Sequence, residues 1–118
     1  MEKRIFDLRG SSVRSVIQLL KGVATDEGRV PFHEIHRSTL VAIAEHIFET
    51  SVDPDELDSD FGSAQSDIGD HELRREITHM ASVLPYLEPD SMTPRAEALE
   101  RLASSWGVAD VTIKGAMD

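Results

Sequence analysis

The sequence predicts an all-α fold: a single-domain helical bundle built from two pseudo-repeated helical hairpins plus a short C-terminal helix. Apolar residues recur about every 3.6 residues in four segments, which is the period of an amphipathic helix. Each segment begins beside serine, aspartate, threonine or proline, residues that favour helix starts. No segment shows the apolar and polar alternation of a strand. A chain of 118 residues has the length of one domain, 1–118.

The first hairpin follows a lead-in over residues 1–10. Ser11 or Ser12 offers an N-cap for a first helix that we expect to end near Ala24. Its apolar positions predict one buried face: Val13, Val16, Ile17, Leu20 and either Val23 or Ala24. The second helix is expected from about Pro31 to Thr50, with Pro31 in its first turn, where a missing N–H costs nothing.

An acidic connection over residues 51–69 separates the two hairpins. It contains no lysine or arginine, and its acidic residues alternate with glycine and serine. Such a composition is typical of a solvated loop. We expect a linker with one short helical turn near residues 54–57.

The second hairpin begins where Asp70 can cap a third helix that runs to about Leu84. A fourth helix is expected with Thr93 as N-cap, and Gly107 is placed to end it. The remaining tail has room for a short last helix at most.

The composition excludes several classes of function. The formal net charge is -10, from 22 acidic and 12 basic residues, and this argues against nucleic acid as a partner because phosphate binding relies on Lys and Arg. No apolar run approaches the roughly 20 residues that span a bilayer, so no direct membrane insertion is expected. The N-terminus lacks the apolar core of a secretory signal and the chain has no cysteine, so we expect a cytoplasmic protein.

The two halves of the sequence resemble each other around a proline. Pro31 and Glu34 keep the same spacing as Pro94 and Glu97, and an acidic turn precedes each pair. Both halves therefore have the order helix, acidic turn, Pro-x-x-Glu, helix. Pro-x-x-Glu is also a general signature of a helix start, which two unrelated helices could share. We interpret the pattern as duplication of a helical hairpin.

The first acidic turn has an acid at position 27, followed by Gly28, Val30 and Glu34. This spacing resembles that of the TerB-like helical domain, a family named for tellurite-resistance proteins. That family carries an acidic turn of the form Asp-Gly-x-Val-x-x-x-Glu in each of two hairpins. Here Gly28, Val30 and Glu34 match the pattern, and Glu27 stands where aspartate is usual. The resemblance extends over residues 12–108.

The second acidic turn follows the family pattern less closely. Glu88, Met92 and Glu97 correspond to it, but Pro89 stands where glycine is expected, and about one inserted residue is needed. The resemblance implies an all-helical bundle, an acidic surface proposed to take divalent cations, and a non-catalytic role in a stress response or as a scaffold.

The acids that correspond to the family's acidic turns form the candidate metal site. Carboxylate oxygens are the ligands that hard divalent cations such as calcium, magnesium and manganese prefer. The alternative is that these acids only stabilise helix starts through the helix dipole. The candidate ligands are Asp26, Glu27, Glu34, Glu88, Asp90 and Glu97.

A second hypothesis is a small helical metalloprotein or enzyme. His46 and Glu49 on the second helix, with Glu76 and His79 on the third, follow part of the di-iron carboxylate pattern. That pattern needs further glutamates from two more helices, and the first helix has no acid before Asp26. No nucleophile appears with a base beside it.

A third hypothesis is an interaction adaptor or a homodimer, whose apolar face around Trp106 and Val111 would be completed by a protein partner. His33 and His36 do not have the spacing of a helical zinc motif. We expect His36 to be a partly buried histidine with one hydrogen bond, because it lies on the core stripe four residues before Leu40.

Overall fold

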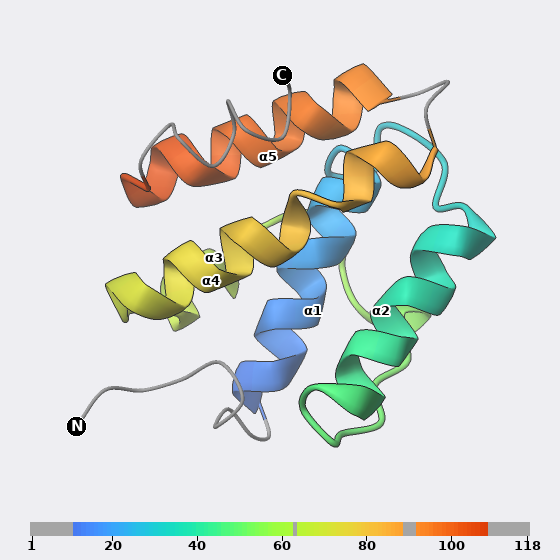
Figure 1. The fold of residues 1–118 in the computed structure, drawn as a ribbon, viewed down its shortest axis with the longest axis horizontal. Coiled ribbons are helices and arrows are strands. Elements are labelled where there is room, and N and C mark those ends of the chain that lie inside the picture. Colours follow the sequence, from blue (N-terminus) through green and yellow to red (C-terminus); the bar gives the residue numbers. More distant parts are fainter. Residues whose placement is uncertain (1–10, 63, 89–91, 109–118) are drawn as a thin grey trace.

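A computed structural model describes residues 11–62, 64–88 and 92–108 of the chain, and every regular element within these ranges is a helix. The all-α prediction is therefore confirmed (Figure 1). The α-helices are α1 (Ser11–Ala24), α2 (Glu34–His46), α3 (Ala64–Asp67), α4 (His71–Ala81) and α5 (Met92–Trp106). Two short 3-10 helices are η2 (Pro54–Glu56) and η3 (Leu84–Leu87).

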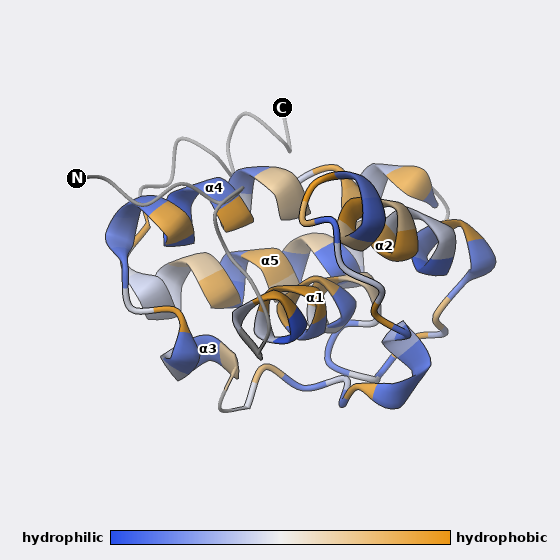
Figure 2. Ribbon diagram, turned by 90° about the horizontal axis from the view of Figure 1, so that it is seen from below, coloured by the Kyte–Doolittle hydropathy of each residue, from blue (hydrophilic) through white to orange (hydrophobic). Residues whose placement is uncertain are grey.

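Helix α1 is the centre of the fold. It contacts α2, α3, α4, α5 and both 3-10 helices, and Figure 2 shows it lying among them. The sequence predicts one buried face, but α1 is apolar over most of its circumference and is buried on nearly all sides. Leu19, which lies outside the predicted stripe, is also fully buried. A helix that is apolar over most of its circumference needs neighbours on most sides, and here they are present.

Helix α2 is shorter than the sequence predicts. It begins at Glu34 and ends at His46, so Pro31 precedes the helix and does not occupy its first turn. His33 is the N-cap and makes no side-chain capping bond. Glu34 does lie in the first turn, as expected. Pro31 lies outside the helix, and its carbonyl accepts a hydrogen bond from the side chain of Arg95.

The second hairpin follows the predicted order closely. Asp70 caps α4 by accepting hydrogen bonds from the N–H groups of Glu72 and Leu73. The helix ends at Ala81, and Pro85 lies in η3, which follows it. Helix α5 begins at Met92, one residue before the expected cap, and ends before Gly107, whose φ of 70° is left-handed.

The acidic connection is more structured than a linker. The expected turn near residues 54–57 is present as η2, and the connection also forms α3, which the sequence did not predict. Val52, Leu57 and Phe61 from this segment enter the core.

The predicted short C-terminal helix lies outside the described residues. The pseudo-repeat of two hairpins stays a prediction. In the part of the chain that the structure describes, no helix is long and apolar enough to cross a membrane.

Candidate functional site

The first acidic turn begins where α1 ends. Asp26 and Glu27 have left-handed φ values of 48° and 53°, followed by Gly28 at 88°. The N–H of Glu27 donates to the Gly22 carbonyl at 2.7 Å, the long-range bond of a Schellman motif that closes the helix. Asp26 therefore occupies the position where glycine is usual, and aspartate tolerates this conformation better than most side chains.

Arg101 of α5 holds both acids of this turn. Its Nη2 lies 2.7 Å from Oδ1 of Asp26 and 3.1 Å from Oε2 of Glu27. The hydrogen bond with Asp26 is the largest cause that raises the pKa of Arg101, and the bond with Glu27 acts in the same direction. The other carboxylate oxygen of Glu27 accepts from the N–H of Phe61 at 3.1 Å. The two acids thus join α1, α5 and the acidic connection.

Arg95 holds the other side of the same turn. It is fully buried, and its guanidinium donates to the carbonyls of Ala24 and Pro31. Burial lowers the pKa of Arg95, and the nearby Glu88 carboxylate acts in the opposite direction. Glu88 therefore lies near an arginine that fastens the first turn.

The remaining candidate ligands are dispersed. Glu34 is exposed and pairs with Arg37 at 3.0 Å, and Arg37 also pairs with Asp55 at 3.1 Å. Glu97 is exposed on α5, in a hollow whose described lining comes entirely from that helix. Asp90 lies outside the described residues.

Among the residues that the structure describes, no three His, Asp or Glu side chains come together in a way that could hold a metal ion. Divalent-cation binding by the six acids stays a prediction. The geometry adds one condition: a cation at Asp26 and Glu27 has to displace the guanidinium of Arg101.

The His and Glu residues of the second hypothesis do not form a helical pair on α2. His46 is the last residue of α2, and Glu49 lies beyond the helix with a left-handed φ of 52°. His79 on α4 is exposed. The i, i+3 geometry that the hypothesis requires is therefore absent on the α2 side.

Trp106 does not form the exposed face that the homodimer hypothesis requires. Its side chain is buried, its Nε1 donates to the Gln65 carbonyl, and Arg74 lies over its ring. That face completes the core of this chain, while Val111 lies outside the described residues.

His36 is fully buried, and its predicted single hydrogen bond is confirmed. Its Nε2 lies 3.0 Å from the Leu84 carbonyl, so this nitrogen carries the proton and donates. Its Nδ1 is buried and has no hydrogen-bond partner among the described residues. Burial lowers the pKa of His36, and the charge of Arg95 acts in the same direction. The ring joins α2 to η3 and is inaccessible to a substrate.

A polar stripe interrupts the apolar surface of α1. Arg14, Gln18 and Lys21 are spaced four and three residues apart and share one helix face. Buried Lys21 donates to the carbonyls of Pro54 and Leu57, both at 2.8 Å. Gln18 donates to the Asp60 carbonyl at 3.1 Å. Two of the three side chains therefore anchor the acidic connection through its backbone.

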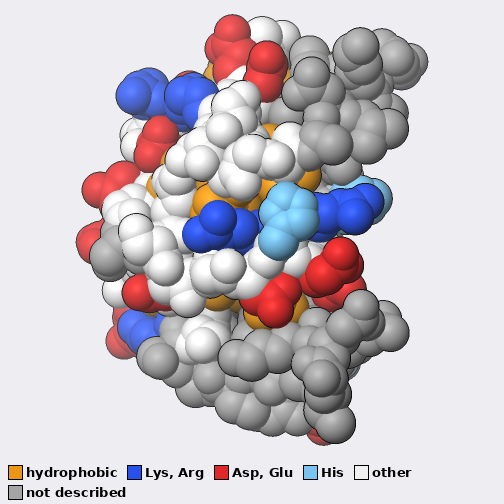
Figure 3. Space-filling view, turned by 90° about the vertical axis from the view of Figure 1, so that its left-hand side faces the viewer, with side chains coloured by type: hydrophobic (Ala, Val, Ile, Leu, Met, Phe, Trp, Pro, Cys, Tyr) orange, Lys and Arg blue, Asp and Glu red, His pale blue; other side chains and the backbone are white. Residues whose placement is uncertain are grey.

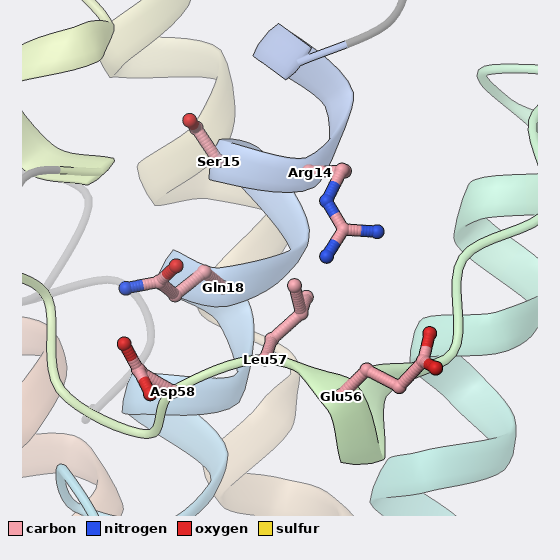
Figure 4. Close-up of a pocket in the computed structure, with 6 residues that line it drawn as sticks. All are labelled: Arg14, Ser15, Gln18, Glu56, Leu57 and Asp58. Atoms are coloured by element: carbon pink, nitrogen blue, oxygen red, sulfur yellow. The ribbon is translucent and has the colours of Figure 1, made fainter.

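The third residue of the stripe, Arg14, lies in a cleft between α1 and the acidic connection (Figure 4). The cleft has a volume of about 310 Å³. In Figure 4 the Arg14 side chain extends from α1 toward Leu57. The cleft is lined by Arg14, Ser15, Gln18, Glu56, Leu57 and Asp58.

The acids of the connection differ in their partners. Asp53 caps η2, Asp55 pairs with Arg37, and Asp67 accepts from Ser15. The exposed carboxylates of Glu56, Asp58 and Asp60 make no hydrogen bond or ion pair with any other described residue. Figure 3 shows one face of the molecule, on which side chains of both charges are interspersed.

Comparison with known protein families, curated proteins and solved structures finds no match to this chain. The TerB-like resemblance therefore stays a hypothesis based on its short motifs.

Sequence reasoning missed the arginines and the polar stripe. Arg95 and Arg101 act on residues more than seventy positions away, and no local pattern reveals such pairs. The stripe on α1 did leave a signal, because three long polar residues on one face of an otherwise apolar helix indicate a special environment.

Proposed function

We propose that this chain is a non-catalytic, TerB-like acidic module that acts through protein contacts, and that its acidic connection binds a basic segment of a partner protein. The observation that carries the proposal is the combination of free acids and a rigid support. Glu56, Asp58 and Asp60 follow one another on a segment whose carbonyls are held by Lys21 and Gln18.

Rigidity matters because a mobile loop loses conformational entropy when it binds, and a fixed one loses less. The connection is fixed at Pro54, Leu57 and Asp60 by side chains of α1, and at Phe61 by Glu27. Its free carboxylates are thus presented in a defined order. Such a surface steers a basic partner electrostatically and selects against acidic ones.

The non-catalytic part of the proposal comes from the TerB-like resemblance. His36, whose pKa burial lowers, is sealed inside the protein and offers no accessible base. A scaffold role in a stress response, including tellurite resistance, is what the TerB-like resemblance adds. No observation favours the metalloprotein alternative over this proposal.

The proposal is tested with labelled lysine-rich peptides and fluorescence anisotropy. We expect a basic peptide to bind, an acidic peptide of equal length not to bind, and the affinity to fall with added salt. The triple variant Glu56→Gln, Asp58→Asn, Asp60→Asn should bind about tenfold more weakly.

The matched control removes three exposed acids elsewhere, by Glu45→Gln, Glu97→Gln and Glu100→Gln. It has the same net charge as the test variant. Equal losses in both variants would show that only overall charge attracts the peptide, and would refute the docking surface.

A further inference from the structure

The polar stripe of α1 includes one side chain that has no polar partner among the described residues. Lys21 and Gln18 each donate to carbonyls of the acidic connection, whereas the guanidinium of Arg14 makes no hydrogen bond or ion pair with any other described residue. The Arg14 side chain nevertheless lies in the cleft between α1 and the acidic connection, and it extends toward Leu57 (Figure 4). An arginine fork is suited to bidentate binding of a carboxylate.

The charges lining the cleft restrict its occupant. The lining contains one arginine and two acids, Glu56 and Asp58, so it has both signs with an excess of one negative charge. A wholly basic segment would place a cation against Arg14. The occupant therefore has to carry a carboxylate next to positive side chains.

The last residues of a basic segment have this chemistry. The α-carboxylate of the chain terminus suits Arg14, and the basic side chains beside it suit Glu56 and Asp58. Buried Leu57 provides an apolar floor for the methylene groups of a lysine or arginine. A volume of about 310 Å³ is at the small end for ligand pockets and fits a chain end rather than a large ligand.

We propose that the cleft between α1 and the acidic connection binds the free carboxyl terminus of a basic peptide segment, with Arg14 holding the α-carboxylate and Glu56 and Asp58 holding the basic side chains. This inference rests on the proposed docking function and specifies which part of the partner enters the cleft.

The test compares two peptides that end in Lys-Lys-Arg, one with a free carboxylate and one with a carboxamide. We expect amidation to weaken binding to the natural protein about tenfold, because it removes the charge-assisted bidentate contact with the carboxylate. The Arg14→Gln variant should bind both peptides equally. Arg75→Gln, which removes an exposed arginine of α4, serves as the control and should discriminate like the natural protein.

Each alternative outcome has a separate meaning. If both peptides bind the natural protein equally and the triple acid variant loses binding, the docking function stands and the terminus inference is wrong. If amidation weakens binding to Arg14→Gln as well, Arg14 does not hold the carboxylate. If neither peptide binds, both proposals are wrong.

Free arginine carries the same carboxylate and cation on a small molecule. If free arginine displaces the labelled peptide as effectively as the same concentration of unlabelled peptide does, the cleft is a small-molecule site and the inference is overturned. Circular dichroism and urea unfolding confirm that the variants are folded.

Discussion

At the scale of single residues, His36 couples stability to pH. Its folded-state pKa is lowered by burial, so the folded protein favours the neutral ring. The charged and titratable groups that act on it are Arg95, His33 and Glu88. Protonation would place a second N–H at the buried, unpartnered Nδ1 and a charge in the same electrostatic environment as Arg95.

We predict that the free energy of unfolding falls as pH drops below the unfolded-state pKa of about 6.5, and that this loss levels off below the folded-state pKa. In that interval the unfolded state binds more protons than the folded state. Urea unfolding across the interval measures the effect, with His36→Gln as the comparison. An identical pH slope in both proteins would contradict the assignment to His36.

Lys21 is the residue on which the ordered state of the acidic connection depends. Its buried Nζ satisfies two carbonyls, those of Pro54 and Leu57. Lys21→Met keeps most of the side-chain volume but leaves these acceptors without their donor, which costs about 1–3 kcal/mol. We expect a lower urea midpoint together with faster amide exchange in residues 54–61. Unchanged exchange there would show that the apolar side chains and the bonds to Gln18 and Glu27 hold the connection without Lys21.

At the scale of elements, Gly22 sets how closely the acidic connection approaches α1. A Cβ at this position would lie 2.6 Å from the ring of Phe61 and 3.0 Å from the Ser59 carbonyl. Alanine in a helix interior is otherwise better than glycine by about 1 kcal/mol. Phe61 is buried and cannot swing away, so the clash should outweigh this gain.

We predict that Gly22→Ala destabilises the protein by about 1–3 kcal/mol, the usual cost of overpacking. Gly69→Ala is the control, because a Cβ there has no atom within 4 Å. Thermal unfolding of both variants provides the measurement. A stabilised Gly22→Ala protein would mean that α1 and the connection can separate at little cost.

At the scale of the whole molecule, the excess of acids raises the question of cations. Arg101 already pairs with Asp26 and Glu27, and Arg37 pairs with Glu34 and Asp55. We therefore expect calcium, magnesium and manganese to bind the natural protein weakly, and the Arg101→Gln variant to bind them more tightly. Isothermal titration at millimolar cation tests this. No heat of binding with either protein would end the cation hypothesis.

The predicted elements succeeded where a local pattern was sufficient. The caps at Asp70 and Gly107 and the apolar spacing of α1 are properties of a few neighbouring residues, and the structure confirms them. The predicted start of α2 at Pro31 was wrong, because proline suits a loop as well as the first turn of a helix. Its carbonyl is held by Arg95, a residue far away in the sequence.

The sequence by itself determined the all-α class, the order of the main helices and the acidic character of the connection, since periodicity, capping and charge are local or additive. Only the tertiary structure decided that α1 is surrounded on nearly all sides and that arginines of α5 hold the first acidic turn. It also brought Arg14, Glu56 and Asp58 together in the lining of one cleft. These arrangements depend on how distant segments pack, and the charges involved acquire partners only when the chain has folded.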